Sequence, residues 1–263
     1  MAKDLAIITV HGMGKTKRDY HQDFEGKLSQ AVGRNTWDSR VHLESVYYQD
    51  LMQGHEERYL DASNAKYNLK FDSLREFMVY SFSDAASIEH DKKLYKEIPQ
   101  RIPTALDKSF EVLGNEAKPV LIIAHSLGAQ QVSNYIWDVI KDEGVVSTPS
   151  SGTAQEDFRR LSKLLQLITI GCNIPMFKAG TEKPEIFVRP NVDFTWHNYF
   201  DAHDVLGYPI KTLAPSFDVN WISNIEVKVG GGFSGRPPLS HLQYWTDKDI
   251  IRPMARDIKA FLP

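Results

Sequence analysis

The chain has 263 residues, and its 31 Lys plus Arg nearly balance its 34 Asp plus Glu. This balance does not indicate a polyanionic partner, so we expect no nucleic acid to bind. The length allows a substantial core, and no linker-like stretch divides the chain. We therefore expect one domain spanning residues 1–263.

Cysteine use and hydropathy indicate the compartment. The chain has one cysteine, Cys172, which excludes an internal disulfide and fits a reducing environment. We interpret Cys172 as a small buried residue rather than a reactive thiol. The N-terminus leads directly into a short strand, and no apolar run approaches 18 residues. We expect a cytoplasmic protein without an integral membrane segment, and its oligomeric state stays open.

The first predicted strand, Leu5–Val10, ends in the glycine-rich turn His11-Gly12-Met13-Gly14. Such a turn allows close approach to a bound group and leaves backbone N–H donors available. A rival interpretation is a phosphate-binding loop, because Gly14-Lys15-Thr16 looks like its final part. That motif requires a glycine five positions before Gly14, where this chain has Thr9. Nucleotide binding through Lys15 is therefore only a minor alternative.

Hydrophobic spacing predicts the elements that precede the central strand. Helices are expected at Tyr20–Val32 and Ile98–Leu113, with a strand inside Arg40–Asp50. Between them, apolar residues at helical spacing favour another helix; they are Phe71, Leu74, Phe77, Met78 and Phe82. Two interpretations stay open for this stripe: the buried face of a helix on the sheet, or part of a cover over an apolar pocket.

Ser126 is the candidate nucleophile. It separates the predicted strand Val120–Ala124 from a predicted helix over Gln130–Ile140. A serine on so tight a turn has a strained backbone, and the residues two before and two after it must be small. Ala124 and Gly128 meet that requirement. The turn also directs the Leu127 N–H, at a helix N-terminus, toward a developing oxyanion.

The strand, the serine and the helix resemble the nucleophile elbow of the α/β-hydrolases, Gly-x-Ser-x-Gly, with Ala124 replacing the first glycine. The resemblance implies a mostly parallel sheet with helices on both faces and a helical insertion before the nucleophile strand. It also implies a lid or rim around residues 51–117. In lipase-like members, the residue after an early His-Gly pair supplies the second oxyanion donor, here Met13, and His11 shapes the loop.

The remaining elements are expected after the serine. We predict a surface loop at Gly144–Gln155, a short helix at Phe158–Leu165, strands at Leu167–Ile170, Phe194–Phe200 and Ile225–Val229, and a final helix from Asp247. The resemblance places the turn from Gly171 to Pro175 on the active-site side. Loop Ala179–Val192 could line the substrate entrance.

A serine needs a histidine base, which is oriented in turn by a carboxylate. In this fold the acid precedes the histidine. The loop after Phe200 resembles the acid loop of many lipases and favours Asp204, with Asp201 as the alternative. His241 lies in a glycine- and proline-rich loop and is the candidate base, with His203 in reserve. His125 is expected to face away from the neighbouring serine.

These residues predict a serine hydrolase that cleaves a small-molecule or lipid ester through an acyl-enzyme. Ser126, Asp204 and His241 would form the triad, and the backbone N–H groups of Met13 and Leu127 would form the oxyanion hole. No metal or organic cofactor is required by this chemistry. A catalytically inactive hydrolase-fold protein that binds a partner is the alternative.

Overall fold

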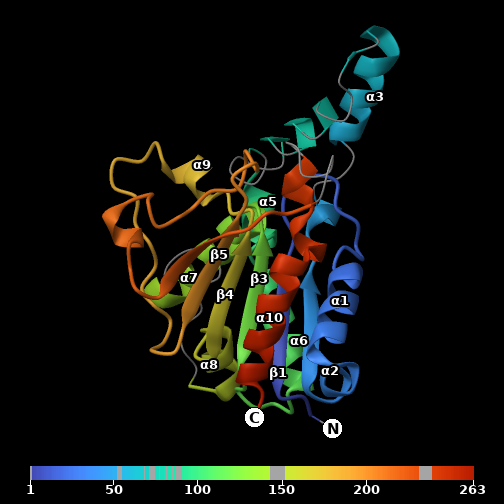
Figure 1. Cartoon of the computed structure of the whole chain (residues 1–263). Helices are drawn as coiled ribbons and strands as arrows, with labels where there is room; N and C mark the ends of the chain where they lie inside the picture. The colour runs from blue at the N-terminus through green and yellow to red at the C-terminus, as the bar shows by residue number, and fades with distance from the viewer. Residues whose placement is uncertain are drawn as a thin grey trace.

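A computed structural model describes residues 2–51, 55–67, 91–142, 152–230 and 239–263, together with 69–70, 75–76, 78–80, 82–83 and 86. Its centre is a six-stranded sheet in the order β2-β1-β3-β4-β5-β6 (Figure 1), in which every neighbouring pair is parallel. The strands are β1 Leu5–Val10, β2 Val41–Val46, β3 Val120–His125, β4 Leu164–Ile170, β5 Thr195–Phe200 and β6 Ile222–Glu226.

The strand order reverses between β1 and β3. From β1 the chain moves outward to β2, then returns to add β3, β4, β5 and β6 on the other side of β1. Loops that leave neighbouring strands in opposite directions open a crevice at their carboxyl ends, where open α/β sheets bind ligands. Val10 and Ala124 are register partners at this point, so the turns after β1 and β3 face each other.

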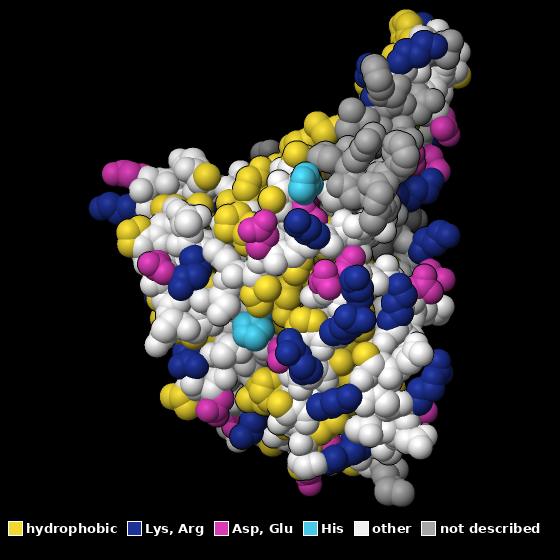
Figure 2. All heavy atoms as spheres, in the orientation of Figure 1, with side chains coloured by type: hydrophobic (Ala, Val, Ile, Leu, Met, Phe, Trp, Pro, Cys, Tyr) yellow, Lys and Arg dark blue, Asp and Glu magenta, His cyan; other side chains and the backbone are white. Residues whose placement is uncertain are grey.

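Helices cover both faces of the sheet because its side chains alternate between two apolar clusters. One face packs against α6 Arg101–Val112, α7 Leu127–Lys141, α8 Ala154–Arg159 and α9 Ile174–Lys178. The other packs against α1 Gln22–Val32, α2 Arg34–Arg40 and α10 Lys248–Phe261. Lys and Arg side chains spread over this second face (Figure 2), as expected for helices with one buried side.

The parallel sheet with helices on both faces confirms the expected α/β class and agrees with the α/β-hydrolase fold. Most predicted elements are present within a few residues of their expected bounds. Gly33 ends α1 at φ 106°, and the Asp247 side chain caps α10 by accepting the Asp249 N–H. Both residues act as their sequence positions predict.

Two predicted elements have the wrong bounds. The helix expected at Phe158–Leu165 lies earlier, at α8, because Thr153 caps its start by accepting the Glu156 N–H. Leu161 then adopts φ 64°, which ends helical structure and lets β4 begin at Leu164.

The strand expected at Ile225–Val229 also lies earlier, as β6 Ile222–Glu226. Its register follows β5, from Trp196 opposite Ile222 to Phe200 opposite Glu226. After Glu226 the Val227 N–H still donates to the Phe200 carbonyl at 2.9 Å, and further along the Val229 N–H donates to the Asp201 carboxylate. The alternating pattern over 225–229 therefore belongs to a segment that ends the sheet.

The segment expected to contain a lid is described only in part. Helix α3, His55–Tyr67, projects beyond the carboxyl edge of the sheet, and α5, Lys92–Glu97, lies closer to it (Figure 1). Helix α6, in contrast, packs on the sheet through Ile102 and Leu106. Within the predicted apolar stripe, Met78 and Phe82 are exposed, while Phe71, Leu74 and Phe77 lie outside the described residues. The lid or rim around 51–117 stays a prediction.

Short 3-10 helices in the described part of the chain connect these elements; they are Gln49–Leu51, Pro215–Phe217, Leu239–Leu242 and Tyr244–Thr246. The loop expected at Gly144–Gln155 lies mostly outside the described residues, since only 152–155 are described. Residues 179–192 form turns and irregular structure, as predicted. Among the described residues, no helix has the length and hydropathy that crossing a membrane requires.

The approach of β1 to α7 depends on close backbone contact, and substitutions at two helical glycines can test it. A Cβ at Gly128 would lie 2.7 Å from the Val10 carbonyl oxygen and would also meet the His11 carbonyl. Both obstacles are backbone, so Gly128→Ala should lower the free energy of unfolding by about 3 kcal/mol in urea titration. Gly26 is exposed in α1 with open space around it. Gly26→Ala should raise stability by about 0.5–1 kcal/mol, and equal effects of the two substitutions would contradict this packing.

Candidate active site

Ser126 occupies the turn between β3 and α7 with φ 51° and ψ −122°. A non-glycine residue rarely adopts this conformation, which costs about 1–3 kcal/mol and tends to occur at functional sites. The backbone N–H of Ser126 donates to the Ile170 carbonyl at 3.1 Å, which ties the turn to the end of β4. Its hydroxyl oxygen is buried and makes no hydrogen bond with the described residues. The predicted strand, strained serine and helix are therefore present.

The turn after β1 lies directly against this serine. A Cβ at Gly12 would lie 2.7 Å from the Ser126 Cβ and 3.0 Å from His125 Nδ1. Only a glycine allows the two turns to approach so closely. The predicted oxyanion residues Met13 and Leu127 follow Gly12 and Ser126 directly. The fold thus brings together two segments separated by more than 100 positions in the chain.

His11 shapes the first turn, as predicted. Its Nδ1 lies 2.7 Å from the Gly12 carbonyl oxygen, and its Nε2 lies 3.1 Å from the Tyr48 backbone N. The carbonyl can only accept and the amide can only donate, so the ring is neutral with its proton on Nδ1. Burial lowers the pKa of His11 to about 4. The bond holds the Gly12 carbonyl toward His11, so the Met13 N–H of the same planar peptide points the opposite way.

Tyr48 supports the same turn and was not identified from the sequence. Its hydroxyl donates to the His11 carbonyl at 2.7 Å, and its ring stacks on His11 with centroids 3.9 Å apart. Tyr48 follows β2, on the far side of β1 from Ser126. The sequence carried no signal for this role beyond a tyrosine after a predicted strand.

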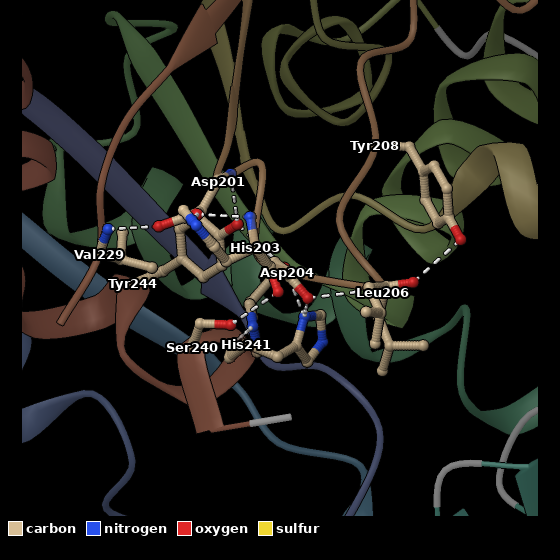
Figure 3. A network of polar contacts seen from close by, with 11 residues as sticks. Asp201, His203, Asp204, Leu206, Tyr208, Val229, Ser240, His241 and Tyr244 are labelled. Atoms are coloured by element: carbon tan, nitrogen blue, oxygen red, sulfur yellow. Dashed lines mark hydrogen bonds and ion pairs between the residues drawn. The ribbon is translucent and has the colours of Figure 1, made fainter. Parts of the chain in front are cut away.

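Asp204 and His241 form a buried pair at the same edge of the sheet (Figure 3). The His241 Nδ1 lies 2.8 Å and 3.0 Å from the two carboxylate oxygens of Asp204. The Leu206 N–H and the Tyr244 hydroxyl also donate to this carboxylate, at 3.0 Å and 2.9 Å. Burial alone would raise the pKa of Asp204, but the bonds from His241, Leu206 and Tyr244 outweigh it, and the pKa is lowered.

Asp201, the alternative acid, is linked to Asp204 through Tyr244, and Asp204 is the residue that contacts His241. Its carboxylate accepts the backbone N–H groups of His203 and Val229, each at 2.7 Å. Its backbone N–H donates to the Tyr244 hydroxyl at 2.8 Å, and Tyr244 donates in turn to Asp204 (Figure 3). Asp201 therefore fastens the end of β5 and supports Tyr244, whereas Asp204 contacts the imidazole. The His203 side chain is exposed and contacts Asp201.

The expectation that His125 faces away from Ser126 stays a prediction, but His125 has a role that the sequence did not indicate: it contacts the loop of the candidate base. The His125 Nε2 lies 2.8 Å from the backbone carbonyl of His241, and the two rings lie 4.7 Å apart. The reason is strand alternation: Leu121, Ile123 and then His125 point to the α10 face, where the His241 loop arrives. Since a carbonyl only accepts, His125 donates from Nε2. Burial, aided by the nearby His241, lowers its pKa to about 3.

The turn after β4 completes the wall around the pair. A Cβ at Gly171, which has φ 56°, would lie 3.1 Å from His241 Cε1 and 3.2 Å from an Asp204 carboxylate oxygen. The turn predicted to lie on the active-site side therefore borders Asp204 and His241. Cys172 is buried next to it, and burial raises the pKa of its thiol to about 12, as expected for an inert core residue.

Other chemistry is less well supported by the described residues. Among them, no group of three or more His, Cys, Asp or Glu side chains could hold a metal ion. Lys15, the residue that a phosphate-binding loop would use, is exposed and pairs with Glu57 at 3.0 Å.

No protein-family model matches the chain, and no curated protein matches it. Among solved structures, the chain is similar to a protein provisionally named a YdeN-like hydrolase, from Pectobacterium atrosepticum. The two share 9% identity with a TM-score of 0.39, over 99% of this chain and 94% of the other. So distant a likeness carries no argument about activity, and the site has to be interpreted from its own geometry.

The two buried neutral histidines make stability depend on pH. His11 and His125 have folded pKa values of about 4 and 3, both below the usual 6.5. The unfolded chain binds more protons than the folded chain below pH 6.5, so stability falls as pH falls through that value. Each histidine should cost about 2 kcal/mol between pH 7.5 and pH 5. Asp204 adds nothing in this window, because its lowered pKa lies below it.

Urea titrations at pH 7.5 and pH 5 measure this loss of stability. His125→Gln keeps a side-chain donor but cannot titrate, so it should remove about 2 kcal/mol of the loss. His42, whose pKa is also lowered by burial, continues to contribute. His203→Gln is the matched control, because this histidine is exposed and should leave the dependence nearly unchanged. A native protein equally stable at both pH values would contradict the neutral burial of His11 and His125.

Proposed function

We propose that this protein is a serine hydrolase that cleaves carboxylic esters through an acyl-enzyme intermediate. One observation carries the proposal: a serine with a strained backbone and a buried hydroxyl lies at the same sheet edge as a buried Asp–His pair. A structural serine gains nothing from a conformation that costs free energy. A nucleophile gains exposure of its hydroxyl to an entering carbonyl group.

In the first half of the reaction, the Ser126 Oγ attacks the ester carbonyl carbon while His241 Nε2 takes its proton. Asp204 stays ionised and holds the Nδ1 proton of His241, which keeps the basic nitrogen on the other side of the ring. The N–H groups of Met13 and Leu127 stabilise the oxyanion of the tetrahedral intermediate. One such donor typically lowers the barrier by about 3 kcal/mol.

In the second half, His241 returns the proton to the leaving alcohol as the carbon–oxygen bond breaks, leaving an ester on Ser126. Water then attacks this acyl-enzyme, with His241 as its general base, and releases the acid. His11, Tyr48 and His125 take no part in proton transfer. They hold the Gly12 peptide and the His241 backbone in place.

Access to the serine is restricted in this conformation. Ser126 is 0% and His241 2% exposed. Burial of this kind excludes water from the reacting groups and strengthens their electrostatic interactions.

The first test uses Ser126→Ala. The native protein should hydrolyse p-nitrophenyl esters and become labelled by a fluorophosphonate on Ser126. The variant should lose labelling, and its kcat should fall by about 10⁶-fold because the nucleophile is gone. Ser109→Ala is the matched control: this buried serine donates to the Ala105 carbonyl inside α6, remote from the site, and its loss should leave labelling intact. A folded native protein that neither labels nor turns over would favour the inactive, partner-binding alternative.

The second test separates the two candidate acids. Asp204→Asn should lower kcat by about 10⁴-fold, because an amide cannot hold the productive imidazole tautomer. Asp201→Asn should keep kcat within about tenfold, but should lower stability by about 1–3 kcal/mol, because one backbone donor loses its acceptor. Esterase kinetics and urea titration of both variants measure the contrast. If Asp201→Asn caused the larger loss of kcat, the assignment of the acid would be wrong.

A further inference from the structure

The side chain of Asn173 is completely buried and makes no hydrogen bond with the described residues. Asn173 lies in the turn between β4 and α9, and its side chain is 0% exposed. Neither its Nδ2 nor its Oδ1 makes a hydrogen bond with the described residues. Native proteins rarely leave a buried amide without partners at both ends. The turn therefore holds a donor and an acceptor that the described fold does not use.

Helix capping does not account for this amide. Asn173 occupies the N-cap position of α9, where an asparagine oxygen commonly accepts a backbone N–H of the first turn. Here it caps nothing: Pro175 has no N–H to offer, and the Met176 N–H donates to the Asn173 backbone carbonyl at 2.9 Å. The side chain is thus available for something other than local structure.

The turn that carries Asn173 borders the candidate active site. Gly171 lies two residues earlier, and a Cβ added to it would touch both the His241 ring and the Asp204 carboxylate. Ile170, one residue before that, accepts the backbone N–H of Ser126. Three residues span at most about 11 Å. Asn173 therefore lies in the same short turn as the groups that contact the Ser126 backbone and border Asp204 and His241.

We propose that Asn173 is a specificity-determining residue that binds a hydroxyl group of the substrate. This proposal rests on the proposed ester hydrolysis at Ser126. A hydroxyl both donates and accepts, so it can satisfy both ends of the amide. A charged substrate group fits less well, because a neutral amide does not compensate a buried charge. The substrate class is therefore a hydroxylated ester rather than a plain hydrocarbon ester.

Two matched pairs of esters test which half of the substrate carries the hydroxyl. Methyl 3-hydroxybutyrate against methyl butyrate varies the acyl half, and 2-hydroxyethyl butyrate against ethyl butyrate varies the alcohol half. In one pair, the native protein should favour the hydroxylated ester at least tenfold in kcat/KM, because the plain ester leaves the amide unpaired. Asn173→Leu, similar in shape but apolar, should bring that ratio close to one. A native protein without preference in either pair would overturn the proposal, as would a variant that keeps it.

A stability measurement gives a second readout that needs no turnover. In the ligand-free protein, Asn173→Leu should raise Tm by about 2–4 °C, since it removes unpaired buried polar groups. Asn198 is the matched control: it is equally buried, but it accepts from Thr169 and donates to the Tyr208 carbonyl and to Asn224. Asn198→Leu should lower Tm. If Asn173→Leu lowered Tm as well, the amide would have a structural role and the proposal would fail.

Fluorophosphonate labelling separates failure of this proposal from failure of the proposed function. Native protein that labels on Ser126 but shows no hydroxyl preference overturns the role of Asn173 alone. Native protein that does not label at all overturns the hydrolase function, and with it the kinetic part of the Asn173 proposal.

Discussion

The site depends on one close backbone approach, between the end of β1 and the start of α7. The carbonyl groups of Val10 and His11 leave no room for a side chain at Gly128, and Ser126 in turn leaves none at Gly12. This approach brings the two predicted oxyanion segments together beside the serine, which has positive φ. Parallel pairing of β1 with β3 makes the approach possible, since both strands end at the same edge.

The buried Asp204 carboxylate near the serine accepts several hydrogen bonds that stabilise its negative charge. Asp204 accepts from His241, Leu206 and Tyr244, which keeps it ionised despite burial. The flanking histidines, His11 and His125, stay neutral and act only through fixed tautomers. A positive charge on His125 would interact with both Asp204 and His241. Deep burial of the His125 ring avoids that charge.

The sequence predicted the local parts of this arrangement well. A short contiguous pattern comprises the strand, the serine with small residues on either side, and the helix. The structure contains each of these parts. The choice between Asp204 and Asp201 depended instead on which carboxylate meets a histidine 37 positions later. The roles of Tyr48, Tyr244 and His125 were missed for the same reason: they depend on hydrogen bonds across the fold. The bounds of α8 and β4 depended on a left-handed Leu161, which composition does not reveal.

Two buried asparagines at neighbouring strands differ in their hydrogen bonding. Asn198, within β5, is bonded at both ends of its amide and ties the acid loop to the sheet through Tyr208 and Asn224. Asn173, in the turn after β4, is equally buried but bonded at neither end. Ser126 shares that property with Asn173, and both border the turn that approaches His241. Folding alone favours paired polar groups. Asn173 lacks partners among the described residues at both ends of its amide, and this supports the proposal that a substrate hydroxyl group binds there.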